Sequence, residues 1–591
     1  MSEKHPQECR PFVLVILCMI TGVIASLGAV VFRYLIALFH NVFFLGSWSL
    51  LYDANVHTPS SPWGPFVVFV PVIGASMVIY LVRNFAPEAK GHGVPEVIDA
   101  IYYKKGVIRP VVAIIKSLAS ALSIGSGGSV GREGPIVQIG SAFGSGMGQL
   151  LHMPPWQTIT LIASGAGAGI AATFNTPVGG LLFAAEIILH EVSARTLVPV
   201  ILATATATYL GQFFFGAHPA FVIPNLETPY FHLANPFLLI SYLGLGLILG
   251  LTSAIYIKSV YLFEDKFEAL IPRNEYLRHM IGMLPVGIIC LILQKTTGHY
   301  YIEGVGYSTI QDILTGVVNG SALMLLLFVL KLLATSLTLG SGGSGGIFSP
   351  ALYMGATLGG AYGLFLHYIM PSFEISAPAY AIAGMAGVVG GVTGAALTAI
   401  VMIFEMTLDY NVVIPLTITV AVCYGTRRLL CRESIYTMKL VRRGHAIPEE
   451  MRSSTYNLKG VRDLMNRKFI VVSCEKVNSD ISERILKEPD VRWFLLEDSG
   501  KLVGIISREQ ALETSCGKNI SMPLASAART RWVSVDPEIS LHSVVSIMSH
   551  AEAEIAVVCS GKSESVDSVL GIISSDEIAG AIKEASDLFP D

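Results

Sequence analysis

Residues 116–135 read KSLASALSIGSGGSVGREGP, and residues 331–350 read KLLATSLTLGSGGSGGIFSP. The two stretches lie 215 residues apart, and 11 of their 20 aligned positions are identical. Each consists of an apolar run that predicts a helix, a glycine-serine turn and a segment that ends in proline. A duplicated apolar unit with a glycine-rich break is typical of transporters and channels built from two repeats. We therefore expect the function to be located at the two breaks.

The composition places most of the chain in a membrane. Of the 591 residues, 52% are hydrophobic and 14% are charged, whereas about 25% of residues are charged in soluble domains. Internal Gly and Pro predict short, tilted and broken helices, which are tolerated at membrane depth when they are buried in protein or line a wet cavity. Uncharged runs long enough to cross a bilayer include residues 11–32, 64–82, 196–226, 228–257 and 375–404.

Charged residues become frequent after residue 445, which predicts a soluble domain behind the membrane domain. We expect residues 1–445 to form an all-α integral membrane domain, with two inverted-topology repeats at roughly 12–226 and 228–445. Six Lys or Arg between residues 427 and 443 follow the last span. The positive-inside tendency then predicts a multi-pass protein of the inner (cytoplasmic) membrane whose C-terminal domain lies in the cytoplasm.

The two glycine-rich breaks have the chemistry of an anion site. A helix N-terminus presents free N–H groups and a partial positive charge, and glycine lets the backbone approach a ligand closely. Such amides suit a dehydrated anion and suit a cation poorly. A flexible linker or close helix packing is the plain alternative, but two copies at matched positions argue against it. Neither copy matches GxxxxGK[ST], so the sequence does not favour nucleotide hydrolysis.

Several motifs carry a resemblance to a known family. They are GHGVP at residues 91–95, GREGP at 131–135, FNTPVGGLLFAAE at 174–186, GIFSP at 346–350 and Tyr436 in SIYTMKL. Over residues 12–445 the chain resembles the CLC family of chloride channels and chloride/proton exchangers. The resemblance implies a homodimer in the lipid bilayer with one anion pathway per subunit. No bond is made or broken in such transport, so neither enzyme activity, a metal site, a required cofactor nor a nucleic-acid partner is expected.

The resemblance also implies roles for individual residues. The amides of Ile347 and Phe348, with the hydroxyl of Tyr436, are expected to bind a central anion, and amides around residues 131–134 an external one. The carboxylate of Glu133 is expected to act as the gate, because it occupies the anion position and swings away when protonated. The anion-binding residues expected on this basis are His92, Gly93, Gly131, Arg132, Gly134, Ile347, Phe348 and Tyr436.

Two of these assignments have alternatives in the residues themselves. Glu133, an acid in an apolar turn, could simply form a surface salt bridge with Arg132. His92 stands where the family usually has the Ser of GSGIP, whose hydroxyl binds the anion. A neutral imidazole donates one N–H and a protonated one adds charge, so we hypothesise that His92 contacts the anion and makes transport pH-dependent. The alternative is that His92 points away and a backbone amide replaces it.

The position that relays protons in exchangers has changed. Exchangers of the family commonly carry two consecutive acids after the FNTP-like segment, and the second relays protons from the cytoplasm. Here the pair is Glu186 and Ile187, and a second nearby acid position is Ile98. An aliphatic side chain cannot carry a proton, so we predict passive, channel-like conduction. The alternative is a chloride/proton antiporter that uses water, His190 or Glu191 as its relay.

Two rivals from other classes are less well supported by the sequence. A membrane-embedded enzyme would need an acid-base or metal cluster within the spans, and the intramembrane Asp, His and Cys are scattered. A cation carrier would need acids or carbonyls along its path. Lys116 is a further intramembrane charge, for which we expect a counter-charge or a water-filled cavity.

A second internal repeat occupies the soluble part. The sequence GIIS occurs at 504–507 and 571–574, each time after a β-rich run and before a polar helix start. This pattern resembles a tandem pair of CBS domains of α+β class, at roughly 456–515 and 522–585. Such pairs often bind adenine nucleotides through Ser/Thr-x-x-Asp; the candidates here are Ser507, Ser574 and Glu577, with Gln510 in place of one acid. Two roles stay open for this part of the chain: it binds an adenine nucleotide, or it is a purely structural dimerisation module.

Overall fold

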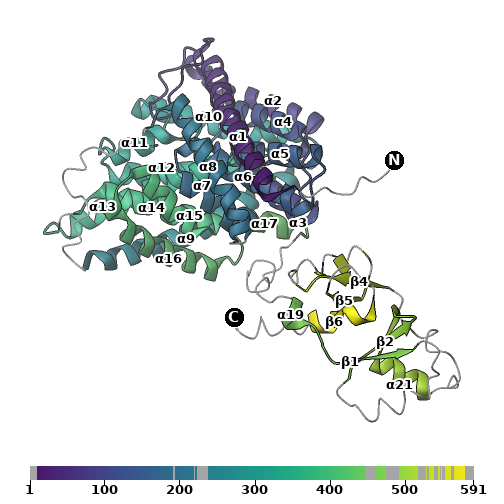
Figure 1. Ribbon diagram of the computed structural model, residues 1–591. Helices are drawn as coiled ribbons and strands as arrows, with labels where there is room; N and C mark the ends of the chain where they lie inside the picture. Colours follow the sequence, from purple (N-terminus) through teal and green to yellow (C-terminus); the bar gives the residue numbers. More distant parts are fainter. Residues whose placement is uncertain are drawn as a thin grey trace. The chain divides into compact units, whose positions relative to one another are not determined.

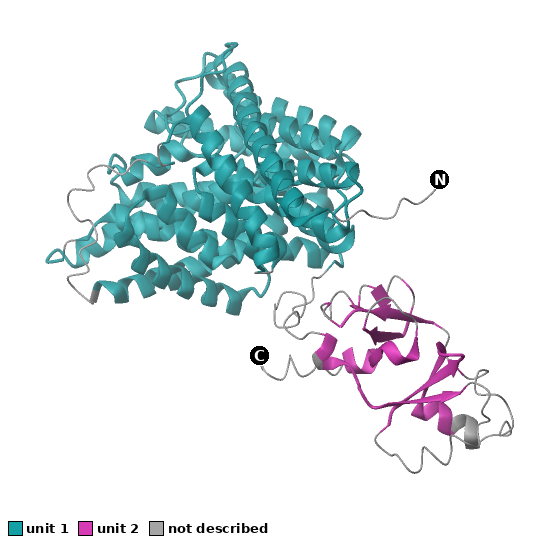
Figure 2. Ribbon diagram, viewed as in Figure 1, with its two compact units in different colours: residues 1–447 teal, residues 448–591 magenta. Residues whose placement is uncertain are grey.

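The chain divides into two compact units, Met1–Ile447 (unit 1) and Pro448–Asp591 (unit 2), shown in Figure 2. The predicted boundary at residue 445 adjoins a segment outside the described residues. The computed structural model describes residues 9–190, 193–217, 220–221, 237–373, 375–445, 461–473, 491–516, 528, 531–537, 539, 544–545, 547–548, 551, 553–560 and 565–578. Unit 1 is helical and unit 2 combines strands with helices, as the sequence predicted.

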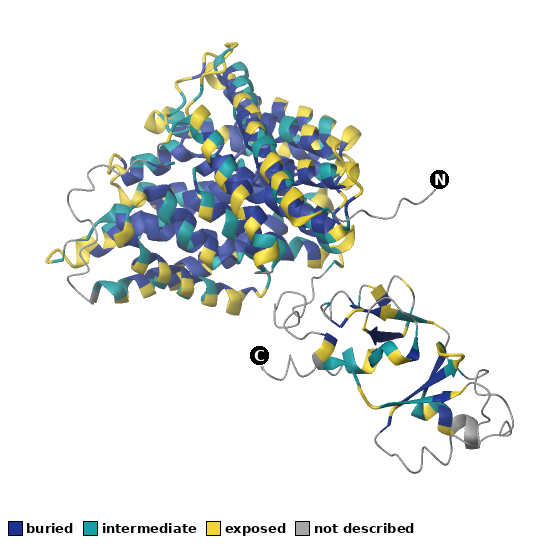
Figure 3. Ribbon diagram, viewed as in Figure 1, coloured by how far each residue is buried: buried dark blue, intermediate teal, exposed yellow. Residues whose placement is uncertain are grey.

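Unit 1 is a bundle of long and short helices (Figure 1). Seven helices in the described part of the chain are long and apolar enough to cross a membrane, and buried side chains fill the interior of the bundle (Figure 3). The helices are α1 (Pro11–His40), α2 (Val70–Phe85), α3 (Val94–Tyr103), α4 (Val111–Gly125), α5 (Glu133–Leu150), α6 (Pro155–Phe174), α7 (Pro177–Phe183), α8 (Ala194–Phe215), α9 (Phe237–Leu270), α10 (Glu275–Thr297), α11 (Tyr307–Leu314), α12 (Ser321–Gly340), α13 (Phe348–Ile369), α14 (Ala377–Thr393), α15 (Ala396–Thr407), α16 (Val413–Leu430) and α17 (Ile435–Arg442).

Matched hydrogen bonds relate the two halves of unit 1. The hydroxyl oxygens of Ser120 and Ser344 are 2.9 Å apart, and those of Thr335 and Ser129 are 3.2 Å apart. In each pair, a residue of the first repeat contacts a residue of the second. With the 215-residue offset, Ser120 corresponds to Thr335 and Ser129 corresponds to Ser344. The second pair is therefore the first pair with the two repeats exchanged. Such an exchange is expected of two repeats related by a pseudo-two-fold axis.

Two glutamates, one in each repeat, make equivalent contacts, and each contacts the start of a helix in the other repeat. Glu186, in the π-helical segment Ala184–Leu189 that follows α7, accepts a hydrogen bond from the backbone N–H of Thr398 (2.8 Å), in the first turn of α15. Glu405, near the end of α15, accepts one from the backbone N–H of Gly179 (2.7 Å), in the first turn of α7. A carboxylate at this position satisfies amides that have no partner within the helix and interacts favourably with the helix dipole.

Two buried lysines anchor the turns that precede α3 and α11. Instead of the counter-charge or wet cavity expected for Lys116, the structure provides two backbone carbonyls, and Lys331 is bonded in the same way. An ammonium group has three donors, so it binds alternate carbonyls of one turn together. The four hydrogen bonds join Lys116 Nζ to Ala89 O (3.0 Å) and Gly91 O (2.7 Å), and Lys331 Nζ to Ile302 O (2.9 Å) and Gly304 O (2.8 Å).

Unit 2 contains two three-stranded sheets of identical order. In each sheet the first strand runs parallel to the second, and the second runs antiparallel to the third. Apolar side chains from both sheets, among them Trp493 and Ile572, form one shared core, so the sequence repeat is also a structural one. The strands are β1 (Phe469–Ser473), β2 (Trp493–Asp498), β3 (Lys501–Ser507), β4 (Trp532–Val535), β5 (Ile555–Cys559) and β6 (Val569–Ser574), with helices α19 (Val461–Leu464) and α21 (Arg508–Cys516).

We predict that Lys116→Met and Lys331→Met each destabilise the protein. Each substitution removes two buried hydrogen bonds, and a lost bond costs about 0.5–1.5 kcal/mol. Lys331→Met also leaves the carbonyls of Ile302 and Gly304 without a donor among the described residues, at about 1–3 kcal/mol per group. The two carbonyls that bind Lys116 each keep another donor, since Ala89 O keeps the Ser344 hydroxyl and Gly91 O keeps the N–H of Gly345. The melting temperature of the detergent-solubilised protein should fall in both variants. Lys295→Met, at an exposed position on α10, is the control and should leave the melting temperature unchanged. Equal melting temperatures for all four proteins would contradict the anchoring role.

Candidate functional site

The helix starts that carry GREGP and GIFSP meet in the structure. Gly131 and Gly346 exchange both backbone hydrogen bonds, at 2.7 and 2.6 Å between nitrogen and oxygen. The turn before α3 packs against them so closely that a Cβ atom on Gly134 would lie 2.1 Å from the carbonyl oxygen of His92. The N-terminal ends of α3, α5 and α13 therefore converge, and their amides and helix dipoles create a positive potential.

Glu133 lies inside this convergence and is 1% exposed. Its Oε1 accepts hydrogen bonds from the hydroxyls of Tyr307 (2.6 Å) and Ser349, and its Oε2 accepts one from the backbone N–H of Ser349 (3.3 Å). The carboxylate thus occupies the N-terminus of α13, a position that suits anions. Arg132 does not pair with it; the guanidinium lies over the rings of Tyr307 (5.1 Å) and Phe174 (6.0 Å).

The residues expected at the central anion lie around the start of α13. Ile347 and Phe348 are buried at the N-cap and first position of this helix, where backbone N–H groups have no acceptor within the helix. The hydroxyl of Tyr256 donates to the carbonyl of Ile347 (3.4 Å) and interacts electrostatically with both Tyr436 and Glu133. The structure therefore gathers every predicted anion-binding residue except Arg132, whose side chain faces a neighbouring cavity.

His92 lies beside Tyr436 and does not point away from the site. The two ring centroids are 5.8 Å apart, and His92 is 3% exposed. Its Nε2 is 3.4 Å from the hydroxyl of Tyr261, which donates to the carbonyl of Ile435. Its Nδ1 is buried without a hydrogen-bond partner among the described residues, so no protein group competes with an anion for this side of the ring.

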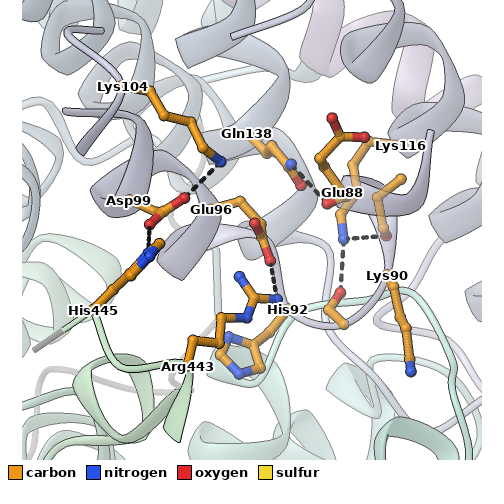
Figure 4. A network of polar contacts seen from close by, with 12 residues as sticks. Glu88, Lys90, His92, Glu96, Asp99, Lys104, Lys116, Gln138, Arg443 and His445 are labelled. Carbon is orange, nitrogen blue, oxygen red and sulfur yellow. Dashed lines mark hydrogen bonds and ion pairs between the residues drawn. The ribbon is translucent and has the colours of Figure 1, made fainter. Parts of the chain in front are cut away.

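An ion-pair network fixes α3 against the chain that follows α17 (Figure 4). Arg443 pairs with Glu96 (2.7 Å), while Asp99 accepts from Lys104 (2.6 Å) and from His445 (2.5 Å). Burial alone would raise the pKa of the Asp99 carboxyl, but the hydrogen bonds from Lys104 and His445 lower it overall. Because α3 positions His92 and α17 carries Tyr436, the network sets the spacing of these two side chains.

A cavity of about 290 Å³ lies beside Glu133 and is lined by its neighbours Arg132 and Tyr307. Arg33 and Arg132 both line it, together with Tyr307, and Asp53 is the acidic residue in its wall. The guanidinium of Arg33 lies over the ring of Phe215 (4.5 Å), which leaves its charge directed at the cavity region. Two arginines against one acid give this space a positive potential that concentrates anions next to Glu133.

Comparison with known proteins identifies the family. The family model described as voltage gated chloride channel matches residues 74–428, and the CBS domain model matches residues 461–516. The chain belongs to the voltage-gated chloride channel (CLC) family. It is thus a multi-pass membrane protein of an anion-transporting family, and the resemblance found in the motifs is confirmed.

Relatives and solved structures agree with this assignment. A putative chloride channel protein ClcB-like from Ralstonia nicotianae is 32% identical over 59% of this chain and 80% of that protein. The H(+)/Cl(-) exchange transporter ClcA from Vibrio parahaemolyticus is 32% identical over 64% and 79%. The crystal structure of a slow cyanobacterial Cl-/H+ antiporter shares the fold with a TM-score of 0.62, at 24% identity over 74% of this chain and 98% of that one. A eukaryotic CLC transporter has a TM-score of 0.60, at 18% identity over 95% and 97%.

The CLC relay position is apolar and buried in the structure. Ile187 lies in a π-helical segment, Ala184–Leu189, and is 4% exposed; Ile98 in α3 is 1% exposed. Of the substitute relays, His190 Nδ1 is 3.3 Å from the hydroxyl of Tyr102, and Glu191 lies outside the described residues. Glu186 is already bonded to the start of α15, so its carboxylate has a structural partner.

The candidate nucleotide residues of unit 2 cap their own helices. The backbone N–H of Ser574 donates to Glu577 (3.0 Å), and the Ser574 hydroxyl bonds the same carboxylate. Ser507 and Gln510 form a reciprocal pair, with bonds of 3.3 and 3.2 Å between backbone and side chain. Ser507 and Gln510 thus form a capping box, in which the serine and the residue three positions later satisfy each other's amides. In the second pair the Ser574 hydroxyl oxygen accepts the backbone N–H of Asp576 (3.2 Å) instead. These side chains therefore have a structural use that needs no nucleotide.

We predict that Gly134→Ala abolishes anion flux. The added methyl group would overlap the carbonyl of His92 at 2.1 Å, and backbone on both sides must move to accept it. Gly146→Ala on the same helix is the matched control, because its nearest neighbour is a side-chain atom of Pro110 at 4.0 Å. Chloride efflux from liposomes measures both variants. Flux in Gly134→Ala equal to that of the control would contradict close packing of the helix starts.

Proposed function

We propose that this protein moves chloride or similar small anions across the membrane through a path gated by Glu133. The position of the Glu133 carboxylate at the start of α13 carries this proposal. A carboxylate is itself an anion, so it competes with a permeant anion for the same N–H donors. Protonation removes its charge and weakens its hold on these amides, which favours opening.

We infer passive, channel-like conduction as the mode of transport. Ile187 and Ile98 support this mode, because neither side chain exchanges protons and both are buried. Proton-coupled antiport is the alternative, and it is supported by relatives that are exchange transporters, including the one from Vibrio parahaemolyticus. The two modes differ in whether chloride movement drives protons uphill.

The proposal includes a homodimer in the inner membrane with unit 2 in the cytoplasm. The basic residues at and beyond the end of α16, including Arg427, Arg428 and Arg443, support this orientation through the positive-inside tendency. For unit 2, adenine nucleotide binding and a structural dimerisation role are both candidates. Titration calorimetry of the full-length protein with ATP, ADP and AMP distinguishes them, since heat with any of the three supports a nucleotide site.

We predict that a chloride gradient across liposomes containing the protein drives chloride flux without uphill proton movement. A pH electrode and a chloride electrode record both ions in the same experiment. Glu133→Gln, which mimics the protonated gate, should remove the part of the pH dependence of chloride flux that comes from Glu133 and leave the part that comes from His92. Ile187→Val is the control for the relay position and should behave as wild type. Proton movement against its gradient would overturn the passive mode and establish exchange.

We predict that His92→Ser changes anion selectivity and the pH profile of transport. The substitution replaces an imidazole N–H with a shorter hydroxyl, and a difference of about 1 kcal/mol in one hydrogen bond changes a selectivity ratio about fivefold. Reversal potentials in mixtures of chloride, bromide and nitrate measure selectivity, at several pH values. If both selectivity and the pH profile stayed at wild-type values, His92 would have no contact with the anion.

A further inference from the structure

Tyr307 belongs to a second copy of the turn that carries His92. Residues 91–94 read GHGV and residues 304–307 read GVGY, 213 positions later. Gly93 (φ 87°) and Gly306 (φ 77°) immediately precede α3 and α11, a conformation that favours glycine. The buried lysines anchor the two turns in the same way. The first turn brings His92 to Tyr436, and the second brings Tyr307 to Glu133.

The hydroxyls of Tyr307 and Ser349 surround one oxygen of the gate. Tyr307 donates to Glu133 Oε1 (2.6 Å), the Ser349 hydroxyl bonds the same atom, and the two hydroxyl oxygens are 2.9 Å apart. Tyr307 is 2% exposed, Ser349 is fully buried, and the Tyr307 ring packs at 5.3 Å against the ring of Phe221. The packing holds the phenol in one place, so the hydroxyl meets the carboxylate without a large ordering cost.

We propose that Tyr307 and Ser349 form a hydroxyl clamp that holds the deprotonated Glu133 in the anion position. The proposal rests on the gating role of Glu133. An ionised carboxylate only accepts hydrogen bonds, so both hydroxyls donate to it, and such charge-assisted bonds are the strong ones. A protonated carboxyl carries no charge, so the bonds from the two hydroxyls lose their charge assistance and the clamp weakens.

The clamp also separates the gate from the neighbouring cavity. Tyr307 lines the 290 Å³ cavity together with Arg132, whereas Glu133 is not among the lining residues. An anion or proton that enters from this cavity meets the phenol before it meets the carboxylate. Tyr307 and Ser349 are therefore positioning residues that set how readily Glu133 yields its place to a permeant anion.

Other charged or titratable side chains face the clamp and stay in place when its hydroxyls are removed. They come from the start of α5 and from α9, α12 and α17, and are Arg132, Tyr256, Lys331 and Tyr436. Because they are common to all variants, a difference between variants reports the hydroxyls alone. The comparison is made in the full-length protein reconstituted in liposomes.

The experiment measures chloride efflux against pH for wild type, Tyr307→Phe, Ser349→Ala and the double variant. Loss of one charge-assisted bond should move the pH of half-maximal flux upward by about one unit. The chloride concentration for half-maximal flux should fall as well, because a weaker clamp is displaced more easily. Tyr362→Phe is the matched control. It removes a tyrosine hydroxyl from α13, the helix that carries Ser349, and this hydroxyl donates to the carbonyl of Ser241 (3.0 Å).

Each variant is repeated in a Glu133→Gln background, where the clamp has no carboxylate to hold and the shifts should disappear. If Glu133→Gln changed the pH profile while Tyr307→Phe and Ser349→Ala did not, the clamp would be wrong and the gate would stand. Shifts that persisted in the Glu133→Gln background would also overturn the clamp. If Glu133→Gln itself left flux and pH profile unchanged, the gate would be wrong. Ser349→Ala removes few atoms, so it carries the test if Tyr307→Phe does not fold.

Discussion

The site is organised around the start of α13, where the backbone N–H of Ser349 and two hydroxyls meet the carboxylate of Glu133. Its amides point at a buried place where the Glu133 carboxylate accepts the backbone N–H of Ser349 (3.3 Å). Removing that charge without a replacement would leave donors unpaired in an apolar setting, which is costly. In the proposed function, carboxylate and permeant anion therefore exclude each other, because they compete for the same donors.

The internal repeat gives the two halves of the site the same backbone conformation but different side chains. Both halves supply a buried lysine, a Gly-x-Gly turn and a helix start, and the contacts between the halves are exchanged in pairs. The side chains at equivalent positions differ: Glu133 corresponds to Phe348, and Gly134 corresponds to Ser349. The shared backbone supplies the amides of the site. The unequal side chains put a carboxylate, that of Glu133, in only one of the two helix starts.

The sequence predicted the repeats, the helical membrane unit and the α+β unit because these depend on local pattern and composition. It did not predict the partners of Lys116, since backbone carbonyls leave no mark in a residue pattern. Tyr307 was also missed, although GVGY repeats GHGV, because the contact with Glu133 joins positions 174 residues apart. The Ser574 and Glu577 pair matches a ligand motif, and in the structure Glu577 accepts the backbone N–H of Ser574 (3.0 Å), so the same spacing also serves a local structural role.

The two capping glutamates bear on the question of proton coupling. Glu186 accepts bonds from two backbone amides and the hydroxyl of Thr398, and Glu405 accepts two amides at the equivalent place. A relay must exchange protons with its neighbours, whereas the oxygens of Glu186 are already occupied by bonds to the start of α15. Glu186 and Glu405 therefore have equivalent structural roles, since each caps the start of a helix in the other repeat. The residue beside it, Ile187, stands where exchangers carry the relay, which is the physical reason to favour conduction without proton transfer.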